Sequence, residues 1–364
     1  MGRDPRIAAH AKELGGWRGP PLTFMEVCGT HTMAIARFGL RDLLPGTIRL
    51  VSGPGCPVCV TPVGFVDHAL ALAATEGVTI ATFGDMMRVP GSASAGAPAP
   101  TLTLARAGGA DVRPVYSPTD ALDIAATEPG REVVFLGVGF ETTAPALAAT
   151  VLQAEARGLA NFSLLSAAKT IPEAMTLLAE ADDLNLDGFL CPGHVSAILG
   201  TDPYLPLASQ HRRACAVAGF EPAEILLGLV SLVRQVEAGA FGVDNCYPGV
   251  VRKEGNPRAM EVMRRVFAPC DAEWRGLGII PGSGLALRAE LSGFDAARRF
   301  EVTLPTPEEP RGCRCGDVLK GLISPSGCAL FGDACTPEHP RGACMVSSEG
   351  TCAASYHYGL EETP

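Results

Sequence analysis

The chain has 364 residues, among them 42 Gly, 30 Pro and 13 Cys, and its formal net charge is -10 at pH 7. The length predicts about two or three domains, and an apolar fraction of 47% excludes global disorder. The acidic charge balance argues against a nucleic-acid binder, because such a protein needs a basic face for the phosphates.

The apolar segments indicate where the protein resides. The first 19 residues carry scattered charges and no apolar core of a secretory signal, and the longest apolar stretch, residues 223–236, is interrupted by polar residues. We therefore expect a soluble, cytoplasmic protein that does not associate with a membrane. In a reducing compartment the 13 cysteines do not form a static disulfide framework. They are inert buried thiols, metal ligands or redox-active thiols.

From residue 47 onward, short β-branched runs alternate with segments of helical spacing. Strands are predicted for residues 47–52, 78–83, 112–116, 132–138, 162–166, 187–191, 214–218 and 276–280. Helices are predicted for residues 65–76, 102–107, 120–127, 144–157, 172–181, 222–238 and 257–266. This alternation, with strands that are nearly all apolar, is typical of parallel sheets covered by helices on both faces. We therefore expect an α/β fold with two parallel sheets.

Changes in composition along the chain predict its division into domains. We expect an N-terminal arm at residues 1–20, a first α/β domain at 21–118, a second at 119–300 and a Cys-rich domain at 301–364. The prolines of LPTPEEPRG are typical of a linker, and cysteines follow at positions 313, 315, 328, 335, 344 and 352. So short a segment, rich in Gly and Pro, builds little core, so the expected staple is zinc or an iron–sulfur cluster.

Two cysteine motifs lie in the first expected α/β domain. In FMEVCGTHT, Cys28 is followed by His31 in a Gly/Thr turn, a pattern compatible with a soft metal site, an activated nucleophile or a buried structural thiol. In SGPGCPVCV, Cys56 and Cys59 form a C-x-x-C pair after a predicted strand. Such a pair closes a disulfide or binds a metal jointly, and the proline between the cysteines favours a redox motif.

Two further motifs follow predicted strands. GVGFETTAP places Glu141, Thr142 and Thr143 at a strand-to-helix junction, where Glu141 acts as an acid, a base or a hydrogen-bond acceptor, or belongs to a helix capping box. CPGHVS places His194 at a strand end, where open α/β sheets bind ligands, and the alternative is a histidine satisfied by a backbone carbonyl. The thiols predicted to serve packing are Cys215, Cys246 and Cys270.

The C-terminal segment holds more thiols than one metal centre uses. Its six cysteines exceed the four that a zinc ion or an iron–sulfur cube requires. A partition of four plus two, a [4Fe–4S] cluster with an adjacent redox dithiol, accounts for all of them. The irregular spacing disfavours a zinc ribbon, which uses paired C-x-x-C hooks.

Together these motifs resemble the HypD family, whose members help to assemble the iron centre of [NiFe]-hydrogenases. The resemblance extends over essentially the whole chain and rests on FMEVCGTHT, SGPGCPVC, GFETTAP, CPGHVS and an ending with CRCGDVLKG and GACMVSSEGTCAA. It implies two α/β domains, a cluster-bearing C-terminal domain and a complex with a small HypC-type chaperone on which an Fe(CN)2CO unit is built. It further implies that a HypE-type partner delivers cyanide and that the hydrogenase large subunit receives the unit.

The resemblance also implies roles for the motif residues. Cys28 would bind the iron together with the chaperone's N-terminal cysteine, His31 would support that site, and Cys56 and Cys59 would form a redox-active pair beside it. The residues expected to line the same cleft are Glu141, Thr142, Thr143 and His194.

The C-terminal segment of the family is similar to ferredoxin:thioredoxin reductase, in which a cube lies beside a reducible disulfide. On that resemblance, Cys315 and Cys344 form the dithiol. The expected ligands of the [4Fe–4S] cluster are Cys313, Cys328, Cys335 and Cys352. Electrons would pass from the cluster through both thiol pairs to the iron. The alternatives are a passive iron-binding scaffold with a structural cluster and a thiol oxidoreductase that acts on protein disulfides.

Overall fold

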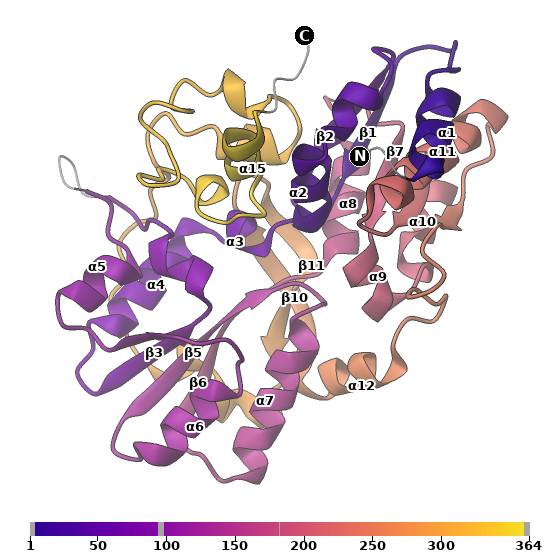
Figure 1. The fold of residues 1–364 in the computed structure, drawn as a ribbon. Coiled ribbons are helices and arrows are strands. Elements are labelled where there is room, and N and C mark those ends of the chain that lie inside the picture. The colour runs from indigo at the N-terminus through magenta and orange to yellow at the C-terminus, as the bar shows by residue number, and fades with distance from the viewer. Residues whose placement is uncertain (1–3, 94–97, 182, 360–364) are drawn as a thin grey trace.

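The computed structural model describes residues 4–93, 98–181 and 183–359, which form two parallel β-sheets, a β-hairpin and a loop-rich C-terminal segment (Figure 1). Sheet A has five strands in the order β2-β1-β7-β8-β9, and sheet B has four in the order β4-β3-β5-β6. Every pair of neighbouring strands in both sheets is parallel. The expectation of an α/β fold with two parallel sheets is confirmed.

Helices cover both faces of sheet A. Its strands are β1 (Leu22–Glu26), β2 (Ile48–Ser52), β7 (Gly188–Pro192), β8 (Ala214–Ala218) and β9 (Val243–Asn245). Successive side chains of a strand face opposite cores, so Phe24 packs with the helices on one face and Met25 with those on the other. The helices around this sheet are α1 (Pro5–Leu14), α2 (Gly29–Arg37), α8 (Ile171–Glu180), α9 (Gly193–Leu199), α10 (Leu205–Ser209) and α11 (Pro222–Ala238).

Sheet B is built in the same way. Its strands are β3 (Val78–Thr82), β4 (Val112–Pro114), β5 (Glu132–Gly139) and β6 (Phe162–Ala168). Its helices are α4 (Val63–Ala73), α5 (Leu102–Ala107), α6 (Asp120–Thr127) and α7 (Ala144–Ala156), and α12 (Pro257–Val266) packs on α7. No helix in the described part of the chain is long and apolar enough to cross a membrane.

The chain crosses from sheet A to sheet B and back again. Strands β1 and β2 precede all of sheet B, whereas β7, β8 and β9 follow it. Sheet B extends across the expected boundary at 118/119, because β3, which precedes it, pairs with β4 on one side and with β5 on the other. Because the chain leaves sheet A after β2 and returns to it at β7, no single cut in the chain separates the two sheets.

Most expected strands and helices are confirmed within a few residues, but the end of the α/β region differs. The short strand expected at 276–280 belongs to β11 (Gly278–Leu287), which pairs antiparallel with β10 (Phe267–Trp274). Residues exposed to solvent alternate with covered ones along β10, so it carries no apolar run that would indicate a strand. This hairpin packs beside β6 and reaches toward the C-terminal segment (Figure 1).

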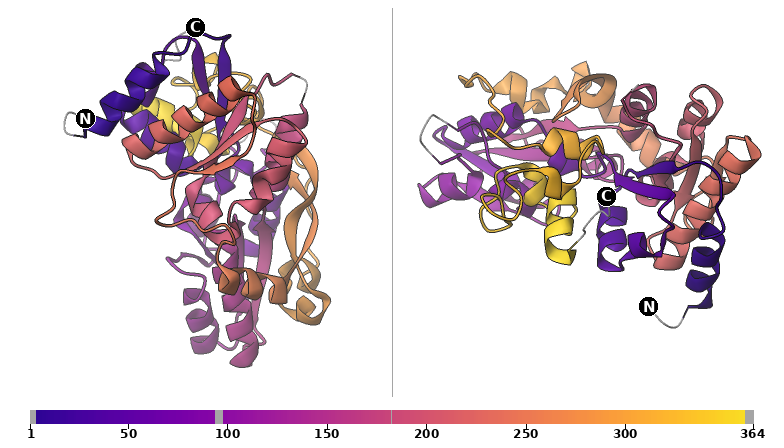
Figure 2. Two further views of the ribbon diagram at one scale, coloured as in Figure 1. Left: turned by 90° about the vertical axis from the view of Figure 1, so that its right-hand side faces the viewer. Right: turned by 90° about the horizontal axis from the view of Figure 1, so that it is seen from above.

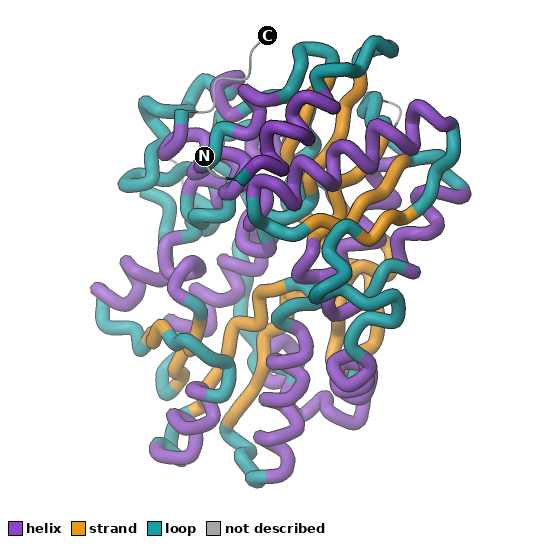
Figure 3. Tube along the Cα trace, turned by 45° about the vertical axis from the view of Figure 1, so that its right-hand side comes forward, coloured by secondary structure: helices purple, strands orange, loops and turns teal. Residues whose placement is uncertain are grey.

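The C-terminal segment, residues 313–359, contains few regular elements. Its helices are α14 (Cys315–Leu319) and α15 (Thr351–Tyr358), and loops connect them (Figure 3). Seen from above, the segment lies over the junction between the two sheets, close to α2 (Figure 2). Two other short helices are α3 (Pro57–Val60), which contacts this segment, and α13 (Ala296–Arg299).

A glycine contact joins the hairpin to the C-terminal segment. Gly276 has a φ of 80°, and a Cβ added to it would lie 2.3 Å from the Cα of Gly316. Gly278 has nearly the same φ, 81°, but a Cβ there would meet nothing within 4 Å. A residue with a side chain would therefore be under backbone strain at either position, whereas only at position 276 would its side chain also clash with a neighbour.

We predict that Gly276→Ala destabilises the protein more than Gly278→Ala does. The positive φ costs about 1–2 kcal/mol at either position, and the clash at position 276 adds about 1–3 kcal/mol. Urea unfolding of both variants measures the difference. Equal losses of unfolding free energy would contradict the close packing of Gly276 on Gly316.

Candidate functional site

Several of the expected site residues lie at the carboxyl edge of sheet A. Cys28 follows β1, Cys56 follows β2 and His194 follows β7. Because β2 and β7 lie on opposite sides of β1, the direction of chain winding reverses at β1. In open α/β sheets, ligands bind in the crevice outside the strand ends at such a reversal.

Glu26 holds Cys28 in position. One carboxylate oxygen of Glu26 accepts a hydrogen bond from the backbone N–H of Cys28 at 3.1 Å, and the other accepts one from the hydroxyl of Thr32 at 2.6 Å. Burial raises the pKa of Glu26 to about 7, although hydrogen bonds from Ser52, Thr32 and Cys28 act in the opposite direction. Sequence reasoning missed this residue. The available signal was a lone carboxylate in an apolar strand, two residues before the cysteine.

The turn that carries Cys28 is in direct contact with the turn that carries Cys56. The backbone N–H of Gly29 donates to the carbonyl oxygen of Gly55 at 3.0 Å. A Cβ on Gly55 would lie 2.2 Å from the backbone nitrogen of Cys28. Only glycine at position 55 therefore allows the two cysteine motifs to lie this close together.

The Cys28 thiol is only 8% exposed at the start of α2. Burial raises its pKa to about 12; the backbone N–H groups of His31 and Thr30 oppose this, and the carboxylates of Glu349 and Glu26 add to it. The free thiol is therefore protonated at neutral pH. Because the thiolate is the form that binds metals, a metal bound at Cys28 would displace this proton.

His31 is fully buried beneath this turn. Its Nε2 lies 2.9 Å from the carbonyl oxygen of Gly219, and its Nδ1 is buried without a hydrogen-bond partner among the described residues. Burial lowers its pKa to about 4, so the imidazole is neutral and Nε2–H donates to the carbonyl. His194 is exposed, and its ring stacks on Phe220 at 4.0 Å, while His31 packs on the same ring at 4.8 Å. Of the two histidines, His31 is thus the one that forms a hydrogen bond with a backbone carbonyl.

Glu141 lies at the carboxyl edge of sheet B, fully buried after β5. One oxygen accepts a hydrogen bond from the backbone N–H of Ile171 at 2.9 Å, and the other has no partner in the described part of the chain. The capping box expected for the following helix is corrected, because Thr143 makes no side-chain cap there and Glu141 caps α8 instead. Burial raises the pKa of Glu141 to about 8, so its carboxyl is mainly protonated at neutral pH. Thr142 is exposed and Thr143 is half-buried.

The C-x-x-C pair packs against the C-terminal segment. The sulfur of Cys56 accepts a hydrogen bond from the backbone N–H of Cys59 at 3.3 Å. Cys59 is fully buried, and its thiol lies 4.0 Å from the carbonyl oxygen of Ala343, the residue before Cys344. Burial raises the pKa of Cys59 well above its ordinary value. The C-x-x-C pair therefore packs beside the segment that carries Cys344.

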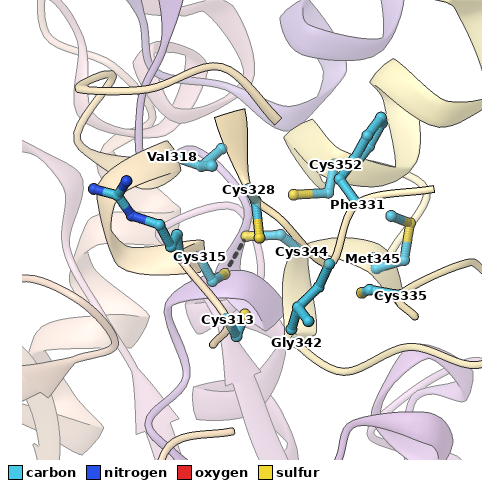
Figure 4. A pocket seen from close by; sticks show the side chains of 12 residues that line it. Cys313, Cys315, Val318, Cys328, Phe331, Cys335, Gly342, Cys344, Met345 and Cys352 are labelled. Atoms are coloured by element: carbon cyan, nitrogen blue, oxygen red, sulfur yellow. Dashed lines mark hydrogen bonds between the residues drawn. The ribbon is translucent and has the colours of Figure 1, made fainter. Parts of the chain in front are cut away.

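All six C-terminal cysteines line one pocket (Figure 4). The sulfurs of Cys315 and Cys344 are 2.6 Å apart, which brings the two residues of the expected dithiol together. The cysteines expected to hold the cluster surround this pair: Cys313, Cys328, Cys335 and Cys352.

The residues of the pocket fit an iron–sulfur cluster by their chemistry. Thiolates are the soft ligands that such clusters use, and the six sulfurs share a pocket whose remaining lining is mostly apolar. Among the described residues, no three His, Cys, Asp or Glu side chains already converge on one point as a metal site. The fit therefore rests on the donor set and its common pocket.

Polar contacts fix the C-terminal segment to both sheets. On the side of sheet A, the hydroxyl of Thr30 donates to Glu349 at 3.0 Å. On the side of sheet B, the hydroxyl of Ser347 donates to Asp85 at 2.8 Å, and Arg88 donates to two carbonyl oxygens of the segment. The segment thus holds its thiols over the place where the two carboxyl edges meet.

Comparisons with known proteins identify the family of this chain. A family model named HypD and described as "Hydrogenase formation hypA family" matches residues 6–359. A hydrogenase maturation factor HypD from Escherichia coli (strain K12) is 47% identical over 348 residues, which cover 94% of this chain and 91% of that protein. The HypD of Rhizobium leguminosarum bv. viciae is 46% identical over 343 residues, which cover 92% of this chain and 88% of that protein. The HypD of Cupriavidus necator is 44% identical over 361 residues, which cover 97% of this chain and 94% of that protein. The chain therefore belongs to the HypD family of hydrogenase maturation factors.

Proposed function

We propose that this chain, together with a HypC-type chaperone, holds the iron on which the Fe(CN)2CO unit of [NiFe]-hydrogenase is assembled, and that its thiol pairs deliver electrons there. Family membership supports the role in maturation. The observation that supports the redox role is the packing of the buried Cys59 thiol against Ala343, the residue before Cys344, which brings two thiol pairs from distant parts of the chain close together.

The iron enters this scheme as cargo, bound at Cys28. A thiolate is a soft ligand and suits low-spin iron that carries cyanide and carbon monoxide. Glu26 fixes the backbone of Cys28 through its hydrogen bond, and the neutral ring of His31 supports the turn from below. The chaperone's N-terminal cysteine would supply a second thiolate, a HypE-type partner the cyanide, and the hydrogenase large subunit would receive the finished unit.

Electrons reach this place by thiol–disulfide exchange. Cys344 attacks an oxidised Cys56–Cys59 pair at Cys59, so that a Cys344–Cys59 bond forms while the Cys56–Cys59 bond breaks and Cys56 leaves as a thiol. Cys315, whose sulfur is 2.6 Å from that of Cys344, then displaces Cys59. The Cys56/Cys59 pair gains two electrons and two protons, and Cys315 and Cys344 end as the disulfide.

The reduced pair is well placed to act on iron at Cys28, because its turn contacts the Cys28 turn through Gly55. A [4Fe–4S] cluster, when bound, supplies single electrons. The residues that would hold it are Cys313, Cys328, Cys335 and Cys352.

The main alternative function is a passive scaffold in which the cluster only stabilises the fold of the C-terminal segment. It is favoured by the C-terminal segment itself, which has few regular elements and depends on contacts with both sheets. An oxidoreductase for protein disulfides fits less well. Cys56, Cys59 and Cys344 are at most 3% exposed, so a folded substrate has no access to them.

We predict that Cys28→Ala abolishes the infrared bands of cyanide and carbon monoxide on the complex purified with the HypC-type chaperone, because the iron loses a ligand. Cys246→Ala is the matched control, since Cys246 also follows a strand of sheet A but is not in the Cys28 turn. Infrared spectra of both complexes measure the effect. Undiminished bands in Cys28→Ala would refute the ligand role.

We predict that Cys56 and Cys59 form a reversible disulfide. Thiol trapping across a series of redox buffers, read by mass spectrometry, should show this pair titrating as a two-electron couple. The buried neighbours Cys191 and Cys215, on adjacent strands of sheet A, serve as the internal control and should stay reduced. A Cys56/Cys59 pair that remains reduced in every buffer would favour the passive scaffold.

We predict that the C-terminal cysteines divide into two classes in the anaerobically purified protein. Alanine at any of the four expected cluster positions removes most iron and sulfide, whereas a Cys315→Ser, Cys344→Ser double variant retains them. Iron and sulfide analysis with EPR measures the outcome. Zinc in place of iron and sulfide in the unaltered protein would overturn the cluster assignment.

A further inference from the structure

Arg275 carries a buried charge that the scheme above does not use. It follows β10 in the turn of the hairpin, and its side chain is only 2% exposed. All three guanidinium nitrogens are buried and without a hydrogen-bond partner among the described residues. The opposing charge is Glu309, whose carboxylate lies 3.4 Å from Nε but whose side chain is 52% exposed. A buried cation in this state is costly unless negative charge compensates it.

The location of Arg275 indicates where that negative charge lies. Its backbone N–H donates to the carbonyl oxygen of Val60, the residue after Cys59, at 2.9 Å. Its neighbour Gly276 lies against Gly316, the residue after Cys315. Arg275 is thus attached to both segments that carry the redox thiols.

The backbone contacts point to the C-terminal pocket. Gly316, against which Gly276 packs, directly follows Cys315, and Cys315 lines that pocket. Arg314 also lines the pocket, but its side chain is 51% exposed and already pairs with Asp317 at 2.7 Å. Solvent and Asp317 weaken the field of Arg314 inside the pocket, whereas the buried charge of Arg275 is screened much less.

We propose that Arg275 is a positioning residue for charge: its guanidinium compensates the negative charge of the thiolates and cluster in the C-terminal pocket and raises the reduction potential of that centre. This inference rests on the proposed function. One electron added to the centre raises its negative charge by one unit without making or breaking a bond, and a nearby buried cation favours that change. The negative charge of Glu309 partly neutralises the Arg275 guanidinium and therefore lowers the reduction potential of the centre.

The test is an EPR-monitored redox titration of the full-length protein, purified anaerobically and checked for iron and sulfide content. We expect Arg275→Met to lower the midpoint potential, Arg275→Lys to remain close to the unaltered protein, and Glu309→Gln to raise the potential. Arg314→Met is the matched control and should shift the potential less than Arg275→Met, because it removes an exposed charge at the same pocket.

The outcomes separate this inference from the proposed function. A full cluster in Arg275→Met with a potential that moves no further than in Arg314→Met overturns the role of Arg275 and leaves the cluster assignment intact. If Arg275→Met does not fold, Glu309→Gln decides, and an unchanged potential in that variant overturns the role. An unaltered protein without iron and sulfide overturns the cluster assignment and the role of Arg275 together.

Discussion

Parallel pairing of β1 with β2 on one side and β7 on the other is the constraint on which the site depends. Because parallel strands end at the same edge, residues from widely separated motifs are brought together there without a dedicated binding domain. Sheet B repeats the arrangement, and the C-terminal segment covers both edges. Close backbone contacts at Gly55 and Gly276 then set the separation between the thiol-bearing turns.

Burial determines the chemical state of most groups at the site. The same loss of water keeps the Cys28 thiol protonated, the His31 ring neutral and the Glu141 carboxyl mainly uncharged near pH 7. These three groups therefore carry little charge at neutral pH. Arg275 is the exception, because a guanidinium does not lose its proton in a protein. Its buried positive charge therefore requires negative charge on neighbouring groups.

The sequence was informative where one local signal sufficed. Helix α11 has its predicted bounds because a first-turn proline and a following glycine mark its ends, and the cysteine motifs were recognisable by spacing alone. Pairing partners were not predictable, since nothing in β3 or β4 indicates that β5 joins them. Strand β1 was not predicted, since its five residues include the polar Thr23 and end at Glu26. The interpretation of Glu26 and Arg275 depends on contacts that only the folded chain makes.

The double crossing between the sheets also has a consequence for synthesis of the chain. On the ribosome, β1 and β2 emerge long before β7, and the hydrogen bond from Thr23 to Asp187 spans 164 residues. Until then, β1 has an unpaired edge that chaperones or other nascent chains can engage. Sheet A is therefore complete only after all of sheet B has been synthesised, and the thiol pocket is complete only after Cys352 has been added. Truncated products are consequently unable to assemble the full set of thiols.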